Sequence, residues 1–127
     1  MLLKGIIDCD IVNYKKISMV LEFPYCNFKC DKECGRAVCQ NSALALAPSM
    51  EIAIPDIIEF YLNNPLTEAI VCQGLEPFDS MSDLCSFIST FRSMSNDDIV
   101  IYTGYNEWEI KYEIDILRIF PNIIIKF

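Results

Sequence analysis

Histidine is the clearest absence from this sequence, because the 127-residue chain contains none. Without imidazole there is no Ser-His or Cys-His catalytic dyad, no His-ligated zinc and no imidazole proton shuttle. Basic residues are also few, with 10 lysines and arginines against 18 aspartates and glutamates, and the net charge is −8. Nucleic-acid binding depends on basic side chains that neutralise phosphates, so this charge argues against a nucleic-acid partner.

Long hydrophobic runs are missing as well. The start, Met1-Leu2-Leu3-Lys4-Gly5, has no apolar stretch of signal-peptide length. No stretch reaches the roughly 18 apolar residues of a membrane-spanning helix, so we expect a cytoplasmic protein without a membrane segment. Hydrophobic residues still make up 53% of the chain and charged residues 22%, a composition typical of folded domains. Domains commonly have about 100–150 residues, so residues 1–127 are expected to form one domain.

Strand-like and helix-like segments alternate along the chain. Apolar, β-rich runs and the amphipathic runs between them predict strands at 17–23, 68–73, 98–102 and 123–126, and helices at 55–62, 80–91 and 106–117. Ser80 is expected to cap the second helix, and Asn106 with Glu109 is expected to form a capping box for the third. The alternation predicts an α/β fold with a mostly parallel sheet, to which the segment before Ile17 adds a strand or hairpin.

Three unusual segments follow the expected strands. A cysteine-rich segment follows residues 17–23, Gly74-Leu75-Glu76-Pro77 follows the second strand, and Thr103-Gly104-Tyr105 follows the third. In sheets of this kind, ligands bind at the carboxyl ends of the strands. We therefore expect these three segments to form one functional site.

Four of the seven cysteines are clustered: Cys26, Cys30, Cys34 and Cys39. An odd number of cysteines in a cytosolic chain is not typical of a disulfide framework. Thiolates this close repel one another unless a cation neutralises them, so we expect a metal. Four cysteines could form a Cys₄ zinc site, and three or four could hold an iron–sulfur cluster; unliganded thiols are the third alternative. The scattered cysteines are expected in the core: Cys9, Cys72 and Cys85.

The cysteine segment resembles the signature of the radical S-adenosylmethionine superfamily. Cys26-Asn27-Phe28-Lys29-Cys30 and the later Cys39-Gln40-Asn41 are similar to its CxxxCxxC motif, which follows the first strand of a partial (β/α) barrel. Gly74-Leu75-Glu76-Pro77 resembles the Gly-Gly-Glu-Pro motif after the second strand. Tyr102-Thr103-Gly104-Tyr105 and the opening Asp10-Ile11-Val12-Asn13 resemble segments of the activating proteins of anaerobic ribonucleoside-triphosphate reductase.

This resemblance implies a reduced partial (β/α) barrel that binds a [4Fe–4S] cluster and S-adenosylmethionine. In the family, three thiolates hold the cluster, and the open iron chelates the amino and carboxylate groups of S-adenosylmethionine. Reductive cleavage gives a 5′-deoxyadenosyl radical, which in the activators abstracts hydrogen from a glycine of the partner reductase. The implied partners are a glycyl radical enzyme, such as anaerobic ribonucleotide reductase, and a flavodoxin or ferredoxin that donates the electron.

The resemblance also implies which cysteines hold the cluster. Cys26 and Cys30 match the motif, and Cys39 is favoured as the third ligand because Gln40-Asn41 follows it. Cys34 is an alternative third ligand, a neighbouring thiol or a fourth ligand. Ligation by all four cysteines, to zinc or to a closed cluster, would instead make the protein a non-enzymatic metal-binding module with a structural or interaction role.

The cofactor-binding residues follow from the same resemblance: Gly74, Leu75, Glu76, Pro77, Thr103 and Gly104. Glu76 is expected to accept a hydrogen bond from the methionyl ammonium. Leu75 stands where the family has glycine. Leucine can replace glycine there only if the backbone φ at this position is negative. The activators continue past their last strand, whereas this sequence ends soon after it, so we expect a C-terminally short member.

Overall fold

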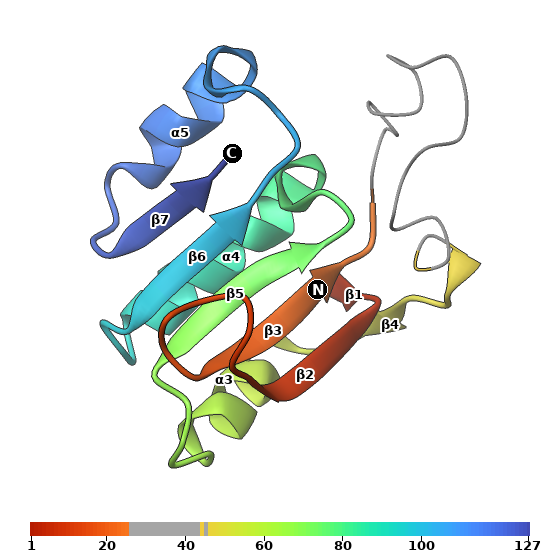
Figure 1. The fold of residues 1–127 in the computed structure, drawn as a ribbon, viewed down its shortest axis with the longest axis vertical. Helices are drawn as coiled ribbons and strands as arrows, with labels where there is room; N and C mark the ends of the chain where they lie inside the picture. The colour runs from red at the N-terminus through yellow and green to blue at the C-terminus, as the bar shows by residue number, and fades with distance from the viewer. Residues whose placement is uncertain (26–43, 45) are drawn as a thin grey trace.

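The centre of the fold is a five-stranded sheet in a computed structural model that describes residues 1–25, 44 and 46–127 (Figure 1). In spatial order its strands are β2 (Gly5–Asp10), β3 (Ser18–Phe23), β5 (Ala69–Gly74), β6 (Asp98–Tyr102) and β7 (Ile123–Lys126). Between the last four strands lie the helices α3 (Ile54–Leu62), α4 (Met81–Arg92) and α5 (Lys111–Leu117).

The sheet is mostly parallel, as predicted. β3, β5, β6 and β7 run in parallel, and β2 pairs antiparallel with β3 as the expected extra strand. A separate small pair joins β1 (Leu2–Leu3) to β4 (Met50–Glu51). In the part of the chain that the structure describes, β2 and β7 form open edges, so this is an α/β sheet that does not close into a barrel.

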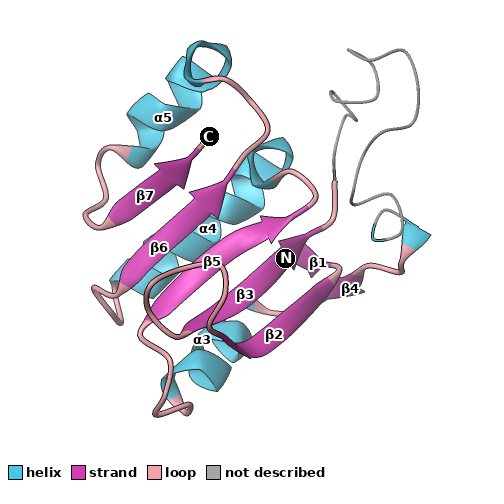
Figure 2. Cartoon of the chain, in the orientation of Figure 1, coloured by secondary structure: helices cyan, strands magenta, loops and turns pink. Residues whose placement is uncertain are grey.

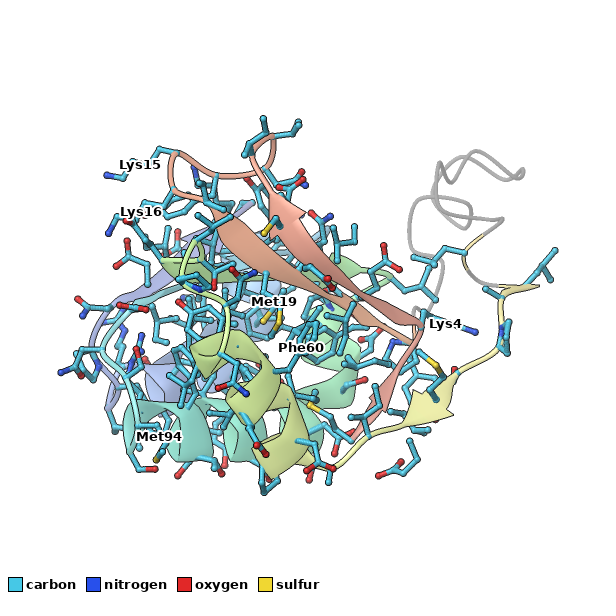
Figure 3. The ribbon with its side chains drawn as sticks, turned by 90° about the horizontal axis from the view of Figure 1, so that it is seen from below. Lys4, Lys15, Lys16, Met19, Phe60 and Met94 are labelled. Carbon is cyan, nitrogen blue, oxygen red and sulfur yellow. The ribbon has the colours of Figure 1, made fainter. Side chains whose placement is uncertain are left out.

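The three helices cover one face of the sheet (Figure 2). Apolar residues of these helices and of the strands form a single buried cluster between the two layers. Met19 of β3, which is only 1% exposed, lies in this layer between the strands and the helices (Figure 3). The predicted inward face of α4 is confirmed. That of α3 is confirmed for Ile57, Ile58 and Tyr61 but wrong for Leu62, which is 46% exposed.

The other face of the sheet is covered by the loop between β2 and β3, which crosses in front of the strands (Figure 1). Val20, Val71 and Val100 are register neighbours on this face and are fully buried, with Tyr14 of the loop packed against them. The Tyr14 hydroxyl donates to Asp98 Oδ2 at 2.8 Å, and the Tyr102 hydroxyl donates to the loop carbonyl of Asn13. These bonds fasten the loop to β6.

The start of α4 differs from the prediction. The Ser80 side chain makes no capping bond, and its hydroxyl is buried without a partner among the described residues. A short 3₁₀ helix, η1 (Pro77–Ser80), precedes α4. Its first backbone N–H, that of Phe78, donates to Glu76 Oε1 at 3.1 Å. The chain therefore enters this helical segment at Glu76, four residues earlier than the serine signal indicates.

The helical segment before β7 begins as predicted. The Asn106 backbone N–H donates to Glu109 Oε1 at 2.9 Å, the reciprocal half of a capping box. The 3₁₀ helix η2 (Glu107–Ile110) then continues into α5, which buries Leu117. None of the helices in the described ranges is long and apolar enough to cross a membrane.

Candidate functional site

The carboxyl ends of β3, β5 and β6 lie side by side at one edge of the sheet (Figure 1). The two loops that leave β5 and β6 are the Gly74–Pro77 and Thr103–Tyr105 segments singled out from the sequence. The third segment follows β3, and its residues Cys26, Cys30, Cys34 and Cys39 lie outside the described residues. The expected convergence is thus confirmed for the β5 and β6 loops.

Gly74 makes the sharp turn at the end of β5. Its φ is +94°, and a Cβ built there would lie 2.7 Å from Phe23 N and 2.8 Å from Glu22 Cα. The next two backbone amides attach this turn to the end of β3 and the residues just after it, since Leu75 N donates to Phe23 O at 3.1 Å and Glu76 N donates to Tyr25 O at 2.7 Å. Only glycine fits this close approach of two backbones.

Leu75 does not have a positive φ, as a leucine at this position requires. Among the described residues other than glycine, Asn122 alone has a positive φ. The backbone of Leu75 is therefore in a conformation open to L-residues, and leucine at this position introduces no positive-φ strain.

Glu76 joins the two loops through its carboxylate. Oε1 accepts from Thr103 Oγ1 at 2.9 Å and from Phe78 N, and Oε2 accepts from Gly104 N at 2.9 Å. The residue is only 6% exposed. A carboxylate has about four acceptor positions, so these donors leave room for about one more. In this structure Glu76 therefore acts first as a bridge between the β5 and β6 loops.

Burial raises the pKa of Glu76, while the hydrogen bonds from Gly104, Phe78 and Thr103 oppose that shift. The folded state then holds a proton on this carboxyl at a pH where the unfolded chain has lost it. Stability from this group is greatest below the ordinary glutamate pKa and is lost as the pH rises through the raised one.

We expect Glu76→Gln to remove this pH dependence. The stability of the wild type relative to Glu76→Gln should fall as the pH rises through that window, because glutamine does not titrate there. Urea unfolding across a pH series measures the difference, with the exposed Glu59→Gln as control. A constant difference between wild type and Glu76→Gln at every pH would contradict the prediction.

A second bridge reinforces the first. The Tyr105 hydroxyl donates to Asp79 Oδ1 at 2.6 Å and so ties the loop after β6 to η1. Thr103 also accepts from Tyr105 N at 3.1 Å through its hydroxyl, and its own backbone N–H donates to Lys126 O at 3.0 Å. Together these bonds hold the ends of β5, β6 and β7 in one rigid rim.

A pocket of about 340 Å³ lies at this rim. Of the predicted cofactor-binding residues, four line it: Gly74, Leu75, Thr103 and Gly104. Glu76 lies behind them as the bridge, and Pro77 is buried in η1 without lining the pocket. The volume is at the lower end of the roughly 300–1,000 Å³ usual for small-molecule sites.

Four further lining residues were not predicted: Glu22, Leu44, Gln73 and Tyr102. Glu22 and Gln73 are register partners, each placed two residues after the valine of its strand and thus on the same face as that valine. The sequence signal was a polar residue near the end of an apolar strand. That signal identifies a site only when the strand register is known.

The scattered cysteines differ in burial. Cys72 is fully buried in β5, and burial raises the pKa of its thiol; burial also raises the pKa of the partly buried Cys85. These two agree with the expected core role. Cys9 is exposed, so its predicted core position is wrong; the strand β2 lies at the sheet edge and turns this side chain outward toward Asn64. Within the described residues, no cluster of three or more potential ligands could hold a metal.

The fold and the pocket define an α/β protein with its candidate site at the carboxyl ends of parallel strands. A family model described as a 4Fe-4S single cluster domain matches residues 16–125. Since this range covers most of the sequence, the chain belongs to that family. A comparison with curated proteins gives no match. The family match indicates a [4Fe–4S] cluster, which favours iron–sulfur over zinc for the clustered cysteines.

Proposed function

We propose that this protein is a radical S-adenosylmethionine protein that reductively cleaves S-adenosylmethionine to a 5′-deoxyadenosyl radical. The observation that carries the proposal is the pocket at the ends of β3, β5 and β6. It is lined by the Gly74–Leu75 and Thr103–Gly104 segments, and in the sequence the cysteine cluster begins three residues after β3 ends. Reductive cleavage of S-adenosylmethionine requires a [4Fe–4S] cluster, which the family match indicates, and a pocket for the ligand.

The winding of the sheet supports a reduced partial barrel. From β3 to β7 the spatial order of the strands follows their order in the chain, and the intervening helices cover one face. Barrel folds add successive parallel strands in this way, whereas doubly wound sheets reverse direction and place helices on both faces. The described strands thus have the connectivity of a barrel segment.

The donor set fits the cluster. In the proposed site Cys26, Cys30 and Cys39 would hold three irons and leave one iron for S-adenosylmethionine, and Cys34 would be a neighbouring thiol. When bound, the reduced cluster supplies the electron that cleaves the S–C5′ bond of S-adenosylmethionine. The chain's own contribution is to shape the pocket at Gly74.

Glu76 has a positioning role in this proposal. By accepting from Thr103 Oγ1 and Gly104 N, its carboxylate fixes the two loops that line the pocket. Glu76 itself does not line the pocket, so a hydrogen bond from the methionyl ammonium to its remaining acceptor position stays a proposal. The same rim is proposed to face a glycyl radical enzyme such as anaerobic ribonucleotide reductase, with a flavodoxin or ferredoxin as electron donor.

Four clustered cysteines also favour a second candidate, a non-enzymatic module with a closed four-cysteine site. If Cys34 and Cys39 both bound metal, no iron would remain open for S-adenosylmethionine. The site would then have a structural or interaction role. Only the first candidate would cleave S-adenosylmethionine, so this reaction distinguishes the two.

Anaerobic reconstitution with iron and sulfide separates them. We expect the visible absorption of a [4Fe–4S] cluster and, with dithionite and S-adenosylmethionine, release of 5′-deoxyadenosine and methionine. Omitting dithionite should abolish the release, because the bond is cleaved by an added electron. Chromatography of the nucleosides measures the product. One tightly bound zinc, or a cluster without cleavage, would rule out the proposed activity.

A further inference from the structure

Glu22 is the charged residue of the pocket. The lining contains this one carboxylate and, among the described residues, neither a lysine nor an arginine. A ligand with phosphate groups would meet like charge there, whereas a ligand with a positive centre would meet an opposite one. The charge of the described part of the lining therefore favours a cationic, phosphate-free ligand.

The fold leaves room for this carboxylate. Glu22 is paired in register with Gly5 on β2, and a Cβ built on Gly5 would lie 2.8 Å from Glu22 Oε2. The carboxylate thus lies over the backbone of Gly5, in space that any larger residue would fill. On the other side its register partner is Gln73, which also lines the pocket.

The Glu22 carboxylate is half-buried. It takes part in no hydrogen bond or ion pair with any residue that the structure describes. A carboxylate at the pocket lining that no described residue neutralises can attract a ligand of positive charge. An uncharged residue would serve equally well if the pocket had only a structural role.

We propose that Glu22 is a specificity residue that recognises the positive charge of the S-adenosylmethionine sulfonium. This inference rests on the proposed function. It implies that the pocket distinguishes S-adenosylmethionine from S-adenosylhomocysteine, which lacks the methyl group and has a neutral thioether sulfur. The amino, carboxylate and nucleoside groups are the same in both ligands, which differ only in the methyl group and the charge at sulfur.

Cleavage removes the charge that Glu22 recognises. When one electron is added, the S–C5′ bond breaks and the sulfonium becomes the neutral thioether of methionine. The attraction to Glu22 is then lost. The same carboxylate that favours binding of the substrate thus favours release of methionine.

The test measures the binding of both ligands to the anaerobically reconstituted protein by equilibrium dialysis. Glu22→Gln keeps the size of the side chain and removes its charge, and it should weaken S-adenosylmethionine binding by about threefold to tenfold at low salt. Binding of S-adenosylhomocysteine should stay unchanged. The control is Glu68→Gln, an exposed residue just before β5 at the opposite end of the strand, which should alter neither affinity.

Each result has a defined meaning. A selective loss of S-adenosylmethionine affinity in Glu22→Gln, reduced by added salt, supports the inference. Equal weakening of both ligands, or no weakening, overturns it while the wild type still binds and cleaves S-adenosylmethionine. If the wild-type protein binds neither ligand and cleaves nothing, the proposed function itself fails.

Discussion

Cys39→Ala is expected to abolish the [4Fe–4S] absorption and to reduce the cleavage of S-adenosylmethionine by more than about 100-fold. Loss of residues that only support metal ligands commonly costs 10–100-fold, so loss of a ligand should exceed that range. Cys34→Ala is expected to retain both the cluster and the cleavage. Iron and sulfide analysis, visible absorption and the yield of 5′-deoxyadenosine measure the difference between the two variants.

The comparison between these variants distinguishes the possible ligand sets among the clustered cysteines. Loss of the cluster in Cys34→Ala with retention in Cys39→Ala would make Cys34 the third ligand. Loss in both variants, together with a wild type that cleaves nothing, would indicate a closed four-cysteine site. Cys9→Ser is a suitable control because this exposed thiol lies on β2, at the edge of the sheet farthest from β7.

The strands and helices were largely predictable because short-range signals fix them. Buried parallel strands need continuous apolar runs, and the observed β6 and β7 have the same bounds as their predicted segments. Pro55 and the Asn63-Asn64-Pro65 turn mark the two ends of α3 within about one residue. These signals act within a few residues, so the sequence alone contains them.

The start of α4 was less predictable, because two possible caps compete there. Ser80 has the residue type of a cap, but Pro77 already begins a 3₁₀ turn that Glu76 caps. The buried position of Glu76 depends on Thr103 and Gly104, which belong to another loop. Local sequence could not indicate that a loop carboxylate would be buried by residues 27 and 28 positions away.

The candidate site was predictable only in part, because some of its residues are placed by the strand order and others by the exact strand register. Gly74 and Thr103 follow strands whose ends must meet in a parallel sheet, so their proximity follows from topology. Glu22 and Gln73 enter the pocket only because β3 and β5 pair with Glu22 opposite Gln73. A shift of β5 by one residue against β3 would turn Gln73 to the helix-covered face, and the continuous apolar runs of the two strands do not exclude that shift.

Gly74→Ala is expected to destabilise the protein by about 3 kcal/mol and to remove the pocket's affinity for its ligand. The positive φ costs an L-residue about 1–2 kcal/mol. The new Cβ would also lie 2.7 Å from Phe23 N and 2.8 Å from Glu22 Cα, and these are backbone atoms of a central strand that cannot move aside. Relief requires β5 to separate from β3 at the rim of the site.

Gly104→Ala is the matched control for this substitution. Gly104 has no positive φ, and its Cβ would lie 3.7 Å from Glu76 Oε2, an ordinary van der Waals distance. We expect a stability change within about 0.5 kcal/mol for this variant. Urea unfolding gives both free energies, and ligand dialysis gives both affinities. Equal effects of the two substitutions would mean that the close approach of β3 and β5 at Gly74 does not hold the rim together.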